Sequence, residues 1–136
     1  MATSKGAIVL PRVTWLILFC GLCLAASGCG GGVPVEGKVV KGGSPYTLAE
    51  GEGITITLVS EDGKTNCSGK VEKDGSFTLL GPSGGAVPPG KYKVGYVHYA
   101  PAPGPTKGAP PPVTKNTKET WDINSSNRTF TLDIGK

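Results

Sequence analysis

Two cysteines of this chain have a spacing that could do chemistry. Cys20 and Cys23 form a C-x-x-C pair, which in a cytosolic α/β context is typical of a redox motif or of half a zinc site. The pair lies inside the apolar run "VTWLILFCGLCLAA", residues 13–26, which follows a short segment with two basic residues and precedes small residues. That layout is typical of an export signal, and the run is shorter than the roughly 20 residues that span a bilayer. We therefore interpret residues 1–28 as a signal peptide, and neither a redox pair nor a metal site is expected.

A third cysteine ends this segment. The stretch "AASGC", residues 25–29, resembles a bacterial lipobox, in which small residues precede a cysteine that is acylated before cleavage. The resemblance implies that Cys29 becomes the lipidated first residue of the mature chain and anchors it to a membrane, since each buried acyl CH₂ contributes about 0.8 kcal/mol. Residues 29–34 would then form a Gly-rich tether. The alternative is an ordinary cleavage beside Ala26 or Gly28 that leaves Cys29 a free thiol.

The rest of the chain has the size of one domain. Removal of the signal leaves about 108 residues, a normal length for a single core and too short for two. The formal charge of the whole chain is +4, of which Lys5 and Arg12 belong to the signal, so no nucleic-acid partner is indicated. Only Cys67 remains beyond Cys29, so no disulfide is expected within the domain. The 22 glycines and 12 prolines favour turns between short strands.

Alternating apolar residues predict strands separated by turn residues. Gly42-Gly43, Asp62-Gly63 and Asp74-Gly75 are expected to form tight turns. The predicted strands are about 33–40, one from 53 that carries Ile54, Ile56 and Leu58, 65–71, one with Phe77 and Leu79, one with Tyr92, Val94 and Tyr96, a short one at 119–123, and a last one with Phe130, Leu132 and Ile134. The proline-rich loop 101–113 should run as an extended excursion. Residues 35–136 therefore predict an all-β antiparallel β-sandwich of about seven strands.

Four segments together resemble a known family. The order "VEGKVVKGGSPY", "ITITLVSEDGK", "GKVEKDGSFTL", "VPPGKYKVGY" is similar to the carboxypeptidase regulatory-like, or transthyretin-like, domain, and especially to small envelope lipoproteins of planctomycete-type bacteria. The resemblance implies a Greek-key sandwich that serves as an accessory, adhesive or structural module. Two connections are longer than in that pattern, residues 47–53 and the proline-rich loop, and we expect individual function to lie in them.

Few side chains suggest catalysis. The one histidine, His98, has no nearby carboxylate in sequence and no second histidine, so we interpret it as a surface residue at a strand end rather than as a base or metal ligand. Cys67 shares a face with Gly69 and Val71, which favours a small buried thiol; the alternatives are a nucleophile paired with His98, or an exposed thiol that forms a dimer by oxidation. We expect no enzyme, no cofactor and no metal.

Two functions remain. The first is an exported, lipid-anchored envelope module, facing the periplasm or the surface, that binds or scaffolds an envelope protein or polysaccharide. In some Gram-negative bacteria, an aspartate directly after the lipidated cysteine is associated with retention in the inner membrane. This chain has Gly30 at that position, which favours the outer membrane. The second is carbohydrate binding or adhesion through exposed aromatic rings. The candidate surface for both is Tyr96, His98, Tyr99 and Trp121, although Trp121 could equally be a core residue and the proline-rich loop a solvated excursion.

Overall fold

The computed structural model describes residues 31–105 and 108–136, and this part of the chain is all-β. The signal, Cys20, Cys23 and Cys29 lie outside the described residues. Eight strands follow one another in the order β1 (Val35–Lys41), β2 (Ser44–Pro45), β3 (Gly53–Ser60), β4 (Asn66–Lys70), β5 (Ser76–Leu79), β6 (Gly90–Tyr99), β7 (Val113–Ile123) and β8 (Thr129–Asp133). Among these residues there is no helix of the length and apolarity needed to cross a membrane.

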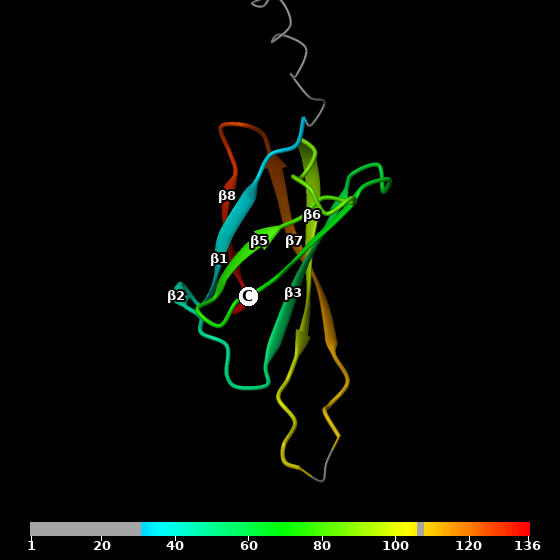
Figure 1. The fold of residues 1–136 in the computed structure, drawn as a ribbon. Coiled ribbons are helices and arrows are strands. Elements are labelled where there is room, and N and C mark those ends of the chain that lie inside the picture. The colour runs from blue at the N-terminus through cyan, green and yellow to red at the C-terminus, as the bar shows by residue number, and fades with distance from the viewer. Residues whose placement is uncertain (1–30, 106–107) are drawn as a thin grey trace, which may run out of the picture.

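The strands form two sheets, as a β-sandwich requires (Figure 1). In one sheet β1 pairs with β2, β5 and β8, and in the other the order is β4-β3-β6-β7. The β4–β5 hairpin runs from one sheet to the other, with isolated bridges between Ser68 and Leu80 and between Val71 and Phe77. The prediction of two antiparallel sheets holds for every pair but one, because β8 lies parallel to β1.

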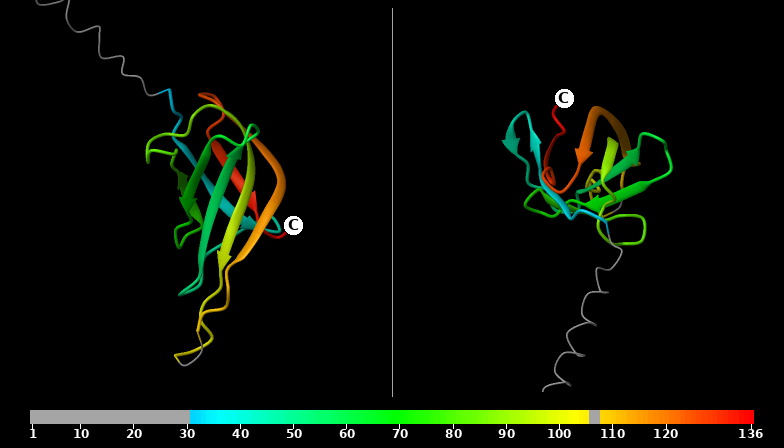
Figure 2. Two further views of the ribbon diagram at one scale, coloured as in Figure 1. Left: turned by 90° about the vertical axis from the view of Figure 1, so that its right-hand side faces the viewer. Right: turned by 90° about the horizontal axis from the view of Figure 1, so that it is seen from above.

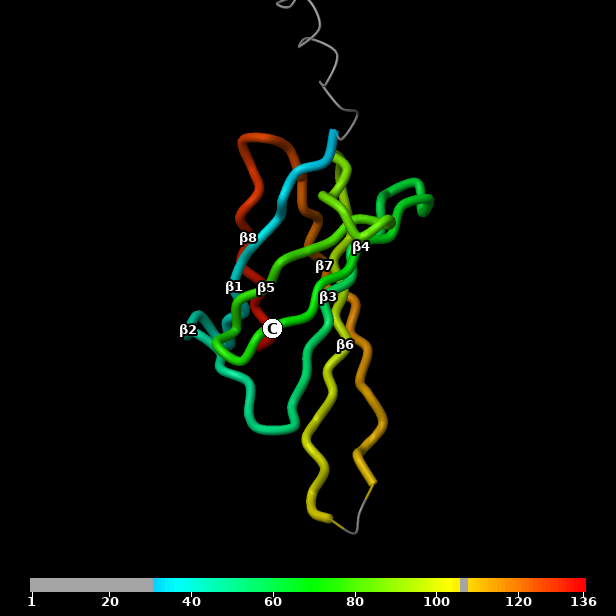
Figure 3. Tube along the Cα trace, in the orientation of Figure 1, coloured from blue at the N-terminus to red at the C-terminus, as the bar shows by residue number. Residues whose placement is uncertain are grey.

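The core lies between the sheets and follows the predicted alternation. Ile54, Ile56 and Leu58 of β3 are fully buried, and so are the inward residues Val35 and Val39 of β1. Figure 3 follows the tight turns that separate the strands. One of them contains Gly75, whose φ of 82° and close approach to the carbonyl oxygen of Tyr46 both require glycine.

Strand β7 corrects the predicted short strand at 119–123. It begins at Val113, so that the proline-rich connection ends one residue earlier than predicted, and it pairs along most of its length with β6. The first half of β7 carries polar, exposed residues because it lies at the edge of its sheet, and such a strand has no apolar alternation to reveal it. A register shift between Lys93 and Gly95 of β6 interrupts the ladder.

Trp121 lies in the core, which resolves the orientation that the sequence left open. Its side chain is 6% exposed and stacks on Phe130, with ring centroids 4.6 Å apart, and on Phe77 at 6.1 Å. Gly37 lies beside this aromatic stack, and a Cβ there would lie 2.5 Å from the Phe77 ring and 2.0 Å from the carbonyl oxygen of Phe130. A glycine at this position therefore allows the three rings to stack.

The two ends of the sandwich differ. The described chain begins at residue 31 at one end, and the proline-rich connection between β6 and β7 projects from the opposite end (Figures 1 and 2). The end of β1, the loop from β2 to β3 and the end of β6 all lie at this second end.

Candidate functional site

The four residues predicted to form a binding surface do not all reach the surface. Trp121 is 6% exposed and Tyr96 is 5% exposed, whereas Tyr99 is 46% exposed. His98 is partly exposed, with 33% of its side chain accessible. The carbohydrate-binding hypothesis required Trp121 on an exposed aromatic surface, and the structure does not place it there. Of the four predicted surface residues, only His98 and Tyr99 are accessible to a partner.

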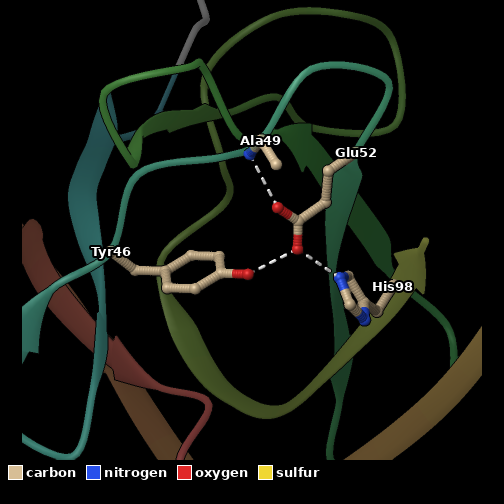
Figure 4. Close-up of polar contacts among 4 residues, drawn as sticks. All are labelled: Tyr46, Ala49, Glu52 and His98. Atoms are coloured by element: carbon tan, nitrogen blue, oxygen red, sulfur yellow. Dashed lines mark hydrogen bonds and ion pairs between the residues drawn. The ribbon is translucent and has the colours of Figure 1, made fainter. Parts of the chain in front are cut away.

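The long loop before β3 brings an unpredicted carboxylate to His98. Figure 4 shows Glu52 between His98 and Tyr46, with Ala49 beside it. One carboxylate oxygen of Glu52 accepts a hydrogen bond from the Tyr46 hydroxyl and lies 2.6 Å from His98 Nε2, and the other accepts from the Ala49 amide at 2.8 Å. The Glu52 side chain is only 6% exposed. This polar cluster of Tyr46, Glu52 and His98 joins the loop to the end of β6.

These contacts determine the protonation of the cluster. Burial alone would raise the pKa of Glu52, but the hydrogen bonds from Tyr46, Ala49 and His98 outweigh it, so the pKa of this carboxyl lies below its ordinary value. The hydrogen bond to Glu52, together with burial and the nearby negative charge, raises the pKa of Tyr46 to about 12. At neutral pH the cluster therefore holds a carboxylate and a neutral phenol.

The ionised carboxylate fixes the orientation and tautomer of His98. A carboxylate only accepts hydrogen bonds, so His98 Nε2 must carry the hydrogen that it donates to Glu52. In neutral His98 this leaves Nδ1 as an acceptor, and protonation makes Nδ1 a donor. A histidine held by a buried carboxylate is an arrangement that enzymes use for a general base and that metal sites use for a ligand.

Cys67, the one thiol among the described residues, lies far from His98. The alternative that paired it with Cys67 is not supported, because His98 lies opposite Ile54 of β3 while Cys67 lies opposite Leu58, about 13 Å further along the strand at 3.3 Å per residue. Cys67 is buried, as the alternation predicted. Burial raises the pKa of its thiol, with an opposing hydrogen bond from Tyr92, so the reactive thiolate is disfavoured.

A cavity of about 320 Å³ lies beside the polar cluster at the mouth between the two sheets. Its walls combine apolar and basic side chains and include no aspartate or glutamate. The lining residues are Lys41, Tyr46, Tyr96, His98, Val113, Lys115, Ile134, Gly135 and Lys136. A larger hollow of about 640 Å³ lies over β1, β5 and β8. Its lining contains acidic residues (Glu36 and Glu72) as well as basic ones (Lys38 and Lys70), so it does not share the purely basic charge of the first cavity.

Sequence reasoning missed Glu52 because it lies 46 residues from His98. Within residues 31–105 and 108–136, no group of three histidine, cysteine, aspartate or glutamate side chains is placed to hold a metal ion. The only available signal was the unusual length of the 47–53 connection, in which individual function was expected.

Comparison with family models, with curated proteins and with solved structures finds no match to this chain.

Proposed function

We propose that this protein is a membrane-anchored lipoprotein of the bacterial cell envelope, whose β-sandwich is a non-enzymatic binding or structural module. The lipid would be carried by Cys29. The fold would be the Greek-key sandwich of the carboxypeptidase regulatory-like, or transthyretin-like, domain that the sequence motifs resemble.

The observation that carries the proposal is the position of the two ends. Residue 31, two residues after Cys29, lies at one end of the sandwich, and the proline-rich connection projects from the other (Figure 2). An anchor at Cys29 would therefore present this connection and the exposed Tyr99 away from the membrane. Proline-rich segments are already extended and lose little entropy when they bind a partner, which suits them to contact with another envelope component.

The composition of the site supports the non-enzymatic part of the proposal. His98 is oriented by Glu52, but the cavity beside it is lined by no serine, threonine or cysteine that could act as a nucleophile. The same lining residues suit binding.

Expression in a bacterial host with separation of the membrane fraction tests the anchor. We expect the wild-type protein in the membrane fraction and acylated. Cys29→Ser should lose the acyl groups and be either released from the membrane or left as uncleaved precursor. Cys67→Ser is the matched control and should stay acylated. A wild-type protein that is recovered soluble and without acyl groups would contradict the proposal.

A further inference from the structure

We propose that the cavity at the mouth of the sandwich, beside the polar cluster, binds a small organic oxyanion, with a carboxylate or phosphate group held by Lys41 and Lys115 and a compact apolar part held by the tyrosine rings. This inference rests on the binding half of the proposed function and names a ligand class for it. It does not depend on the lipid anchor.

The first observation is that a lysine occupies an inward position of the sheet. Residues directly opposite each other in adjacent strands point to the same face, and Lys115 of β7 lies opposite Tyr96 of β6. Tyr96 is buried in the core. Lys115 therefore lies on the same side of the sheet as the core, at the open end of the sandwich where its side chain stays exposed to solvent.

The second observation is the lack of a counter-charge. Within the part of the chain that the structure describes, the only ion pair joins His98 and Glu52, so neither Lys41 nor Lys115 has a carboxylate within 4.0 Å. Lys41, at the end of β1, lines the same cavity from the opposite sheet, and Lys136 also lines it. Glu119 and Asp133 line the adjoining hollow that shares Lys115 and Lys136, but neither lines this cavity or pairs with its lysines within 4.0 Å. Lysines from both sheets around a cavity with no acidic side chain in its own lining favour a bound anion.

The polar cluster leaves His98 with one ring nitrogen that Glu52 does not engage. Because Glu52 takes the Nε2 hydrogen of His98, the remaining ring nitrogen is the only polar atom of that side chain free for a ligand. The hydroxyl of Tyr46 is likewise engaged by Glu52, which leaves the ring of Tyr46 as a wall of the cavity. The buried carboxylate thus fixes both side chains before any ligand binds.

The dimensions and walls limit the ligand. A volume of about 320 Å³ lies at the small end of the range of about 300–1,000 Å³ for ligand sites. Tyr96, Val113 and Ile134 supply apolar surface beside the lysines. A single ring or short chain with one anionic group fits these limits, whereas a polymer does not fit inside the cavity.

The test uses the full chain in nonionic detergent and follows the NMR signals of the His98 ring during titration with phenyl phosphate, benzoate and the neutral benzyl alcohol. We expect saturable shifts with at least one of the two anions and none with the alcohol. Which anion binds more tightly distinguishes a phosphate ligand from a carboxylate ligand. Lys115→Gln and Lys41→Gln should each weaken binding by about tenfold or more.

Two further variants control for folding and for general charge. Lys115→Arg keeps the charge and should bind within a few-fold of the wild type, whereas a purely structural role of Lys115 would not predict this rescue. Lys93→Gln removes an exposed lysine on the other face of β6 and should leave binding unchanged. The proposal is overturned if neither anion shifts His98 up to about 10 mM, if Lys115→Gln binds as the wild type does, or if benzyl alcohol binds equally well. If no anion binds but Cys29 is found to be acylated, the proposed ligand class is wrong and the proposed lipid anchor still stands.

Discussion

Replacing Glu52 by glutamine should change the ionisation of a tyrosine that is six residues away. Glu52 accepts the hydrogen bond of the Tyr46 hydroxyl and, with burial and its own charge, raises the pKa of that phenol from 10.0 to about 12. Glutamine keeps the shape but removes the charge. We expect the pKa of Tyr46 in Glu52→Gln to fall below that of the wild type but to stay above 10.0, because the burial of the phenol remains.

The free-energy consequence can be worked out from the same values. A pKa difference of two corresponds to about 2.7 kcal/mol at 1.36 kcal/mol for each pKa unit. The share that comes from burial is kept in Glu52→Gln, and solvent screens the rest because the phenol is partly exposed, which leaves about 1 kcal/mol for the loss of Glu52. Loss of the charged contact with His98 adds to it, so Glu52→Gln should reduce the free energy of unfolding at neutral pH by about 1–3 kcal/mol.

The sign of the pH dependence follows for each group. The pKa of Tyr46 is raised, so its contribution to stability is complete below 10.0 and is lost as the pH rises through about 12. The pKa of Glu52 is lowered, so its contribution is present above the ordinary value of 4.5 and is lost as the pH falls through the pKa of the folded state. The stability difference between wild type and Glu52→Gln should therefore be largest near neutral pH and shrink on both sides.

Ultraviolet absorbance titration of the phenols, with circular dichroism to confirm folding, measures the first effect, and urea unfolding over a pH series measures the second. Tyr46→Phe identifies the phenol that moves, and Glu50→Gln in the same loop is the matched control, since Glu50 is exposed. Tyr92, whose pKa is raised chiefly by its own burial, should titrate alike in all variants. Superimposable absorbance titrations of Glu52→Gln and wild type would show that Glu52 does not raise the pKa of Tyr46.

Three further results are expected. In the Trp15→Phe full chain, fluorescence from the buried Trp121 should be blue-shifted and poorly quenched by acrylamide, whereas red-shifted emission would place it at a surface. Cys67 should resist thiol reagents until the protein unfolds, because it is 2% exposed and its pKa is raised by burial; labelled peptides detected by mass spectrometry before unfolding would show otherwise. Gly37→Ala should lower the free energy of unfolding by about 1–3 kcal/mol through overpacking against Phe130, and an unchanged denaturation midpoint would contradict the close approach seen there.

Local patterns predicted the parts of the fold that local physics determines. The alternation of Ile54, Ile56 and Leu58 specified a half-buried strand, and the Asp74-Gly75 pair specified a tight turn, since both depend on neighbouring residues alone. The predicted strand with Tyr92, Val94 and Tyr96 is β6, which lies between β3 and β7.

The features that the sequence did not reveal depend on contacts between distant segments. The first half of β7 is polar because it is an edge strand, and its place in the sheet comes from pairing with β6. The parallel pairing of β8 with β1 carries no local signal. Glu52 and His98 meet only because β3 and β6 are neighbours, and the position of Trp121 depended on its stacking against Phe130.

The lipid anchor at Cys29 can be tested by the intact mass of the protein recovered from the membrane fraction. We expect the mass of the chain from Cys29 with two or three acyl groups, and the loss of those groups in Cys29→Ser. An unacylated protein cleaved at another position would contradict it.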